Sequence, residues 1–166
     1  METPFTHLDD EGRLRMVDVS DKEPTRRSAQ ASCVVRSRVN VSSLPAGPGG
    51  LDPVFAARLA GIQAAKRTSQ LIPLCHPINL NDVQVEVTSD GDGVLVRSRV
   101  VTVNRTGVEM EALTACSFAA LSLLNALAAH DAQARFEDLV IERKSGGKSG
   151  DWGRQVAPEA AAREGA

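Results

Sequence analysis

Residues 144–151 (KSGGKSGD) combine the groups that bind an anion. Two ammonium groups, Lys144 and Lys148, alternate with serine hydroxyls and with glycines that let backbone N–H groups approach a phosphate closely. The loop ends like a P-loop, but the leading glycine of that motif would fall at Glu142, which argues against a nucleotide triphosphatase. The loop therefore predicts a phosphate site of another kind. A solvated glycine linker is the alternative.

Residues 71–77 (LIPLCHP) present a second group of reactive side chains. Two prolines restrict the backbone around Cys75 and His76, and a histidine that ionises near neutral pH can serve as an acid, a base or a phosphate contact. A structural role for His76 is the alternative. A structural role is also the alternative for Lys66, because a cation is favoured at the C-terminal end of a helix. Zinc needs three or four ligands and the chain has no CxxC pair, so we predict no metal site.

Residues 106–111 (TGVEME) place two carboxylates at the expected start of a helix. Thr106 and Glu109 fit the S/T-x-x-E capping box. Glu111 follows two residues later and would point about 200° away from Glu109 on a helix, where solvent exposure is the default. Alternatively, the two carboxylates bind the donor edge of a purine or pterin, whose ring N–H and exocyclic amine match a carboxylate.

The strands that must position these segments follow from the hydrophobic pattern. Apolar and polar residues alternate in three segments, as expected for strands with one buried face: residues 31–39, 83–87 and 94–103. Asp-Gly pairs at residues 90–93 predict a hairpin between the second and the third. Residues 136–143 are predicted to be the last strand.

Two helices are predicted between the strands. Asp52 caps the first, which begins at Pro53 and ends near Lys66, with an apolar stripe of Phe55, Leu59 and Ile62. The second spans residues 106–129. The resulting order, βαββαβ, predicts an α+β, ferredoxin-like fold in which an antiparallel sheet carries two helices on one face.

Length, charge and cysteine content limit the alternatives. At 166 residues we expect an N-terminal arm at residues 1–14, a single domain at 15–152 and a flexible tail at 153–166. The net charge of −2 argues against a nucleic-acid partner. The three cysteines are widely spaced, and no signal peptide or long apolar run precedes them. We therefore expect no disulfide framework, no membrane segment and a cytoplasmic protein.

Taken together, four segments resemble the cyclic pyranopterin monophosphate synthase family of molybdenum cofactor biosynthesis: residues 60–68 (AGIQAAKRT), 71–77, 106–115 (TGVEMEALTA) and 144–151. The similarity extends through residues 6–8, residues 16–20 and Arg27. The resemblance implies a lyase that rearranges 3′,8-cyclo-7,8-dihydroguanosine triphosphate to cyclic pyranopterin monophosphate and releases pyrophosphate. It also implies no metal or organic cofactor, and a homohexamer built as a trimer of dimers with its active sites at subunit interfaces.

The resemblance also assigns roles to individual residues. Lys66 and His76 fall at positions expected to take part in catalysis. The positions expected to bind substrate are Arg27, Cys75, His76, Glu109, Met110, Glu111, Lys144 and Lys148. In this assignment the cations neutralise the triphosphate and the two glutamates hold the ring derived from guanine.

The sequence departs from the family pattern at the main acid/base positions. The family carries a lysine in the loop before the first helix, and an aspartate with a lysine three residues later on the second helix. Here these positions are Gly50, Asn125 and Ala128, none of which exchanges protons near neutral pH. On a continuous helix, His130 would lie too far around to replace Ala128. Two hypotheses follow: an active synthase, or a catalytically impaired or diverged paralogue that binds a phosphorylated purine or pterin.

Overall fold

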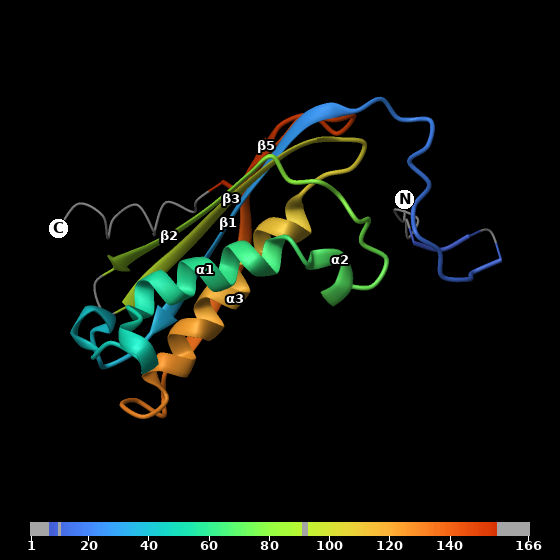
Figure 1. Ribbon diagram of the computed structural model, residues 1–166. Coiled ribbons are helices and arrows are strands. Elements are labelled where there is room, and N and C mark those ends of the chain that lie inside the picture. The colour runs from blue at the N-terminus through green and yellow to red at the C-terminus, as the bar shows by residue number, and fades with distance from the viewer. Residues whose placement is uncertain (1–6, 10, 91–92, 156–166) are drawn as a thin grey trace.

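Five antiparallel strands form one sheet in the computed structural model, which describes residues 7–9, 11–90 and 93–155 (Figure 1). The strands are β1 (Thr25–Arg36), β2 (Asp82–Asp90), β3 (Gly93–Asn104), β4 (Arg135–Ser145) and β5 (Trp152–Gly153). Their order across the sheet is β2-β3-β1-β4-β5. The first four strands reproduce the predicted topology, and β5 adds a short edge strand that the sequence pattern does not predict.

Two long helices, α1 (Pro53–Ala65) and α3 (Glu109–Leu127), cover one face of the sheet (Figure 1). A short helix, α2 (Thr68–Leu71), follows α1, and the loop before α1 contains two 3₁₀ turns, η1 (Val41–Ser43) and η2 (Pro48–Gly50). The predicted ferredoxin-like fold is confirmed. Asp52 caps α1 as expected, because its Oδ1 accepts a hydrogen bond of 2.7 Å from the backbone N–H of Phe55.

The core lies between the sheet and the helices. Alternate residues of β1 are buried against the helices: Ala29, Ala31, Cys33 and Val35. The helices approach each other closely at Gly61, where a Cβ would lie 2.7 Å from the carbonyl oxygen of Ala115. The face of α1 that packs is therefore its small-residue face. The predicted apolar stripe lies largely outside it, since Phe55 is 57% and Leu59 43% exposed.

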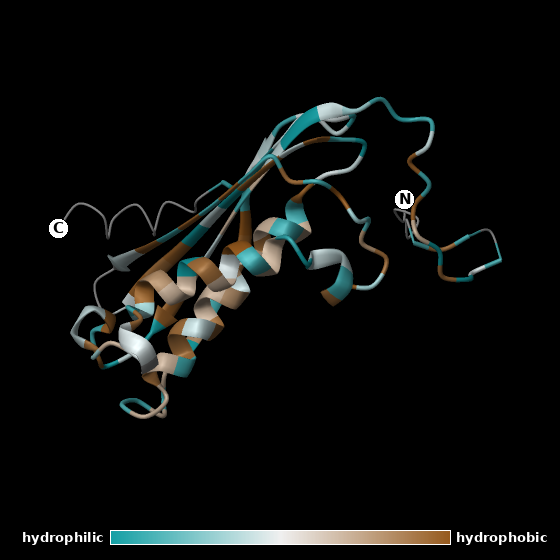
Figure 2. Ribbon diagram, in the orientation of Figure 1, coloured by the Kyte–Doolittle hydropathy of each residue, from teal (hydrophilic) through white to brown (hydrophobic). Residues whose placement is uncertain are grey.

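Helix α3 is the central apolar element of the fold (Figure 2). By length and composition alone it could cross a membrane. However, nine of its residues are buried, and it packs against α1, β1, β3 and β4, which is the pattern of a core helix.

Several boundaries differ from the predicted ones. Strand β1 begins at Thr25 rather than at residue 31, and its polar first half pairs along β3 as regularly as its apolar half. Helix α3 begins at Glu109 rather than at Thr106; its N-cap is Val108, and no side chain caps it. The predicted capping box is therefore wrong.

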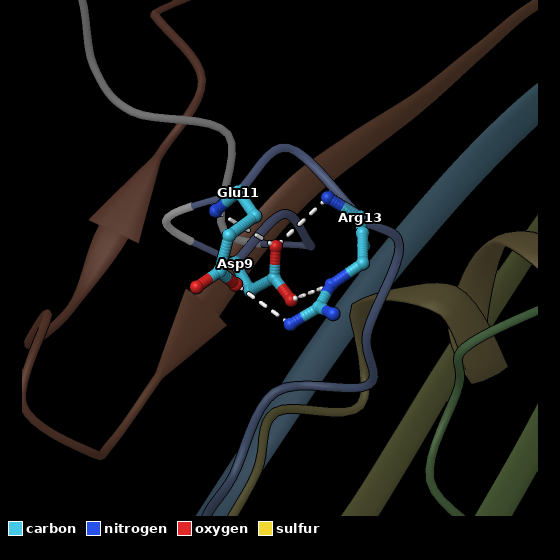
Figure 3. Close-up of polar contacts among 3 residues, drawn as sticks. All are labelled: Asp9, Glu11 and Arg13. Atoms are coloured by element: carbon cyan, nitrogen blue, oxygen red, sulfur yellow. Dashed lines mark hydrogen bonds and ion pairs between the residues drawn. The ribbon is translucent and has the colours of Figure 1, made fainter.

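The N-terminal segment carries a local turn of its own (Figure 3). Leu8 and Leu14 form an isolated bridge, and the Asp9 carboxylate accepts hydrogen bonds from the backbone N–H groups of Glu11 and Arg13. Arg13 also pairs with the Asp9 side chain at 2.8 Å. Exposed pairs of this kind contribute little stability. Residues 1–6 of the predicted arm and 156–166 of the predicted tail lie outside the described residues.

Candidate functional site

A polar cleft of about 220 Å³ lies where the start of β1, the β3–α3 loop and the end of β4 meet. Four cations line it: Lys22, Arg27, Arg105 and Lys144. So do four hydroxyl groups: Ser28, Thr106, Ser145 and Ser149. Glu109 is the one carboxylate among the lining residues. Clustered cations and hydroxyl donors of this kind suit a phosphate or pyrophosphate group.

The pairing of β1 with β4 brings the two sides of this cleft together. Ser28 lies opposite Ser145 and Ala29 opposite Lys144, and the hydroxyls of Ser28 and Ser145 are 2.8 Å apart. Arg27 is fixed from the other side, since its Nε donates to the carbonyl oxygen of Asn104 at 3.0 Å. Residues far apart in the sequence are thus held as one cationic surface.

The glycine loop is a folded turn packed on β1. Gly146 and Gly147 have φ values of 86° and 76°, a region that disfavours side chains. A Cβ at Gly147 would collide with the Arg27 guanidinium, and the Gly146 N–H donates to Asp151 Oδ1 at 3.0 Å. The solvated-linker alternative is therefore wrong. Lys148 is exposed and does not line the cleft.

Gly147→Ala is expected to weaken pyrophosphate binding about tenfold, because a Cβ there displaces the Arg27 guanidinium and one charge-assisted contact is worth about 1.5–3 kcal/mol. Isothermal titration calorimetry measures the affinity. Gly150→Ala is the matched control, since Gly150 also has a positive φ, of 67°, but a Cβ there meets nothing within 4 Å. Equal affinities in the two variants would contradict the contact.

Two carboxylates lie at the start of α3, and one of them, Glu109, lines the cationic cleft. Glu109 pairs with Lys144 at 3.3 Å rather than capping α3. Glu111 is only 5% exposed, so the expectation of solvent exposure is wrong. Burial, together with a smaller effect of the Glu109 charge, raises the pKa of Glu111 to about 7. A buried carboxyl group beside a cationic cleft is a candidate for binding the donor edge of a ring.

The segment that contains Cys75 and His76 lies close to these carboxylates. Leu74 has a φ of 65°, a strained conformation for a residue with a side chain and one that clusters at functional sites. Burial raises the pKa of the Cys75 thiol, and the charge of Glu111 adds to the effect. His76 Nε2 donates to the carbonyl oxygen of Val17 at 2.8 Å, so the proton of neutral His76 lies on Nε2 and Nδ1 can accept.

Other predicted residues lie outside the cleft. Lys66 is the exposed C-cap of α1, and Met110 is 38% exposed at the start of α3. Asn125 and Ala128 are exposed near the far end of α3. Sixteen residues of helix separate Glu109 from Asn125, which corresponds to about 24 Å. One chain therefore does not bring the phosphate cleft and the family's acid/base positions together.

The loop that contains Gly50 lies near the second of these two regions. Leu51 and Asn125 line the same cleft of about 370 Å³ at the end of α3. Gly50 itself is exposed, with a φ of 78° and open space around it. A lysine at this position would have to adopt a left-handed conformation, which costs about 1–2 kcal/mol.

Two of the four cations of the phosphate cleft are absent from the predicted set, Lys22 and Arg105. Lysine is scarce in this chain, with only four residues, and that scarcity is the signal that could have pointed to Lys22. Arg105 directly precedes the segment at 106–111, and only the fold shows that it lines the same cleft as Lys144.

Comparison with known proteins gives a consistent result. The model of the MoaC family matches residues 16–147. A protein of Streptomyces griseus is 49% identical over 93% of this chain and 88% of its own length. Relatives from a Nocardioides and a Nostoc species are 50% and 46% identical, over 90% and 92% of this chain and 95% and 97% of their own lengths. All three are named cyclic pyranopterin monophosphate synthase.

Proposed function

Because the chain belongs to the MoaC family, we propose that it is a cyclic pyranopterin monophosphate synthase of molybdenum cofactor biosynthesis. As a lyase, it rearranges 3′,8-cyclo-7,8-dihydroguanosine triphosphate to cyclic pyranopterin monophosphate and releases pyrophosphate. The observation that carries the proposal is the four-cation cleft with Glu109 in its lining and the buried Glu111 near Glu109, which offers a phosphate site next to a ring site.

The geometry suggests a separate role in the reaction for each group of residues. Lys144, Arg27 and their two cationic neighbours neutralise the triphosphate and stabilise the charge that develops on the leaving pyrophosphate. Glu111, in its ionised form, accepts hydrogen bonds from the ring N–H and exocyclic amine of the substrate. His76, fixed by Val17, presents Nδ1 toward the phosphates or the sugar.

We propose further that the working site is shared between two subunits of a homo-oligomer, a hexamer built from three dimers. The 24 Å between Glu109 and Asn125 supports this arrangement, because a nucleotide-sized substrate does not span about that length of helix. The exposed apolar side chains on the outer surface of the helical layer also support it: Leu51, Phe55, Leu59 and Leu121. We place the reaction in the cytoplasm.

The comparisons favour the synthase over the diverged paralogue, since relatives near 48% identity carry the name of the synthase. The purified protein is expected to release pyrophosphate from the cyclic GTP derivative and to form the pterin product. A coupled pyrophosphate assay and fluorescence of the oxidised pterin measure the two products. Tight binding of the substrate without either product would identify the chain as the diverged paralogue.

A further inference from the structure

The cleft of about 370 Å³ at the end of α3 combines an apolar lining with a few polar groups. Its walls come from the loop before α1, from the first turns of α1 and from the last turns of α3. Most of the lining is apolar, and the polar side chains converge from one side: Ser122, Asn125 and His130. A mainly apolar pocket with a few convergent polar groups is the usual form of a small-molecule site.

His130 reaches this cleft because the helix stops before it. Helix α3 ends at Leu127, and the backbone N–H groups of His130 and Asp131 both donate to the Leu127 carbonyl oxygen at 2.8 Å. Residues 128–130 therefore form a hydrogen-bonded turn directly after the helix. The angular separation of His130 and Ala128 around an ideal helix does not keep His130 out of the cleft. His130 lines the same cleft as Asn125.

The turn that carries His130 is anchored to β1 by its neighbour. The Asp131 carboxylate accepts hydrogen bonds from the Ser37 hydroxyl at 2.9 Å and from the backbone N–H groups of Arg38 and Gln133 at 2.8 and 3.0 Å. These bonds lower the pKa of Asp131, which therefore stays ionised near neutral pH. The position of the His130 backbone is thus fixed before any ligand binds.

His130 is the one ionisable side chain among the residues that line this cleft. Charged groups on the elements around the cleft are Asp131, next to His130, Arg38, which follows β1, and Asp52, which caps α1. Asp52 and Asp131 are both engaged with backbone N–H groups.

We propose that His130 is the general base of the reaction, acting from one subunit on substrate whose phosphates are held in the cationic cleft of the next. The proposal rests on the proposed function and deepens it. The imidazole takes the proton of the substrate hydroxyl while that oxygen bonds to the α-phosphorus. The bond from this phosphorus to the bridging oxygen breaks, its electron pair leaves with pyrophosphate, and the imidazolium returns its proton to solvent. Ser122 and Asn125 orient the hydroxyl by hydrogen bonding.

The test is pyrophosphate release by the full chain carrying His130→Gln. A positioned base contributes about 10²–10⁴-fold, so kcat is expected to fall at least 10²-fold with KM little changed. The pH profile of kcat is also expected to differ between the wild type and the variant, because only the wild type carries a base at this position. His130→Ala is expected to regain part of its rate when imidazole is added. Gln133→Ala, an exposed position on the same turn, is the matched control and keeps the wild-type rate.

A His130→Gln variant with a rate within about twofold of the wild type and an unchanged pH profile would overturn the assignment, as would a failure of imidazole to restore any rate to His130→Ala. Failure of the proposed function has a different signature. In that case the wild type itself releases no pyrophosphate, and the assignment of His130 fails with it.

Discussion

Glu111→Gln is expected to raise the free energy of unfolding at pH 8 by about 3 kcal/mol, an unusual gain for a substitution in a binding site. The cause is burial, which raises the pKa of Glu111 to about 7 from an ordinary value of 4.5. The folded protein therefore keeps a proton that the unfolded chain releases between these two pH values. Stability of the wild type falls as pH rises from about 4.5 to about 7, and it stays lower above pH 7.

Glutamine keeps the shape of the protonated side chain and never ionises, so this pH dependence disappears in the variant. Urea unfolding at pH 4, 6 and 8 measures the effect, with the difference between the two proteins expected to be smallest at pH 4. Glu86→Gln, on the exposed side of β2, is the matched control and is expected to change stability little at any pH. A Glu111→Gln protein no more stable than the wild type at pH 8 would show that the carboxyl group is solvated.

The same variant is expected to lose function as it gains stability. Binding of the substrate ring requires ionised Glu111, because its two oxygens accept from two donors of the ring. Glutamine supplies only one acceptor oxygen, and its side-chain NH₂ group would face a donor group of the substrate ring. We expect KM to rise at least tenfold, since a buried charge-assisted hydrogen bond is worth about 1.5–3 kcal/mol. This effect on KM separates Glu111 from His130, whose loss acts on kcat.

The fold could be predicted because local patterns and topology agree. Alternation along β1, β2 and β3 assigns one face of each strand to the core, and the Asp-Gly pairs in the sequence at residues 90–93 predict the observed pairing of β2 with β3. The first half of β1 was missed for a physical reason. Residues Thr25–Arg27 are polar and exposed, or nearly so, and are held in the strand by pairing with β3 instead of by burial.

The acidic residues at the start of α3 show where local reasoning fails. Thr106 and Glu109 have the spacing of a capping box, but Glu109 instead folds back over Gly107 and pairs with Lys144, 35 positions along the chain. Whether Glu109 caps the helix or forms the ion pair depends on the position of Lys144, which is set by β4. The burial of Glu111 depends equally on the segment at residues 71–77, which packs near it from a distant part of the chain.

The proposed contribution of a second subunit is the part of the site that a single sequence identifies least. Periodicity indicates which residues share a helix face but not that the stripe of Phe55 and Leu59 remains exposed in the isolated chain. It also places Asn125 on α3 without showing that the phosphate cleft lies at the opposite end of the same helix. Only the folded chain shows the separation, and a shared site is the arrangement that removes it.

Two inactive variants, Lys144→Ala and Ala126→Trp, are expected to recover activity when they are mixed in one oligomer. Lys144→Ala removes a cation from the phosphate cleft, and Ala126→Trp fills the cleft at the end of α3. Each variant alone is expected to lose at least 10²-fold in pyrophosphate release, by loss of charge stabilisation or by exclusion of substrate. Co-expression with two different tags, followed by tandem purification, gives the mixed oligomers.

The size of the recovery distinguishes a shared site from a single-chain site. If each site takes its phosphate cleft from one subunit and its α3 end from another, random mixing at equal amounts makes about a quarter of the sites intact. Pyrophosphate release should therefore return to about a quarter of the wild-type rate. Mixing Lys144→Ala with Arg27→Ala is the matched control, because both changes lie in the same cleft and no combination makes an intact one. Recovery in neither mixture would mean that each chain completes its own site, and the gap of about 24 Å along α3 would then have to close by movement within one subunit.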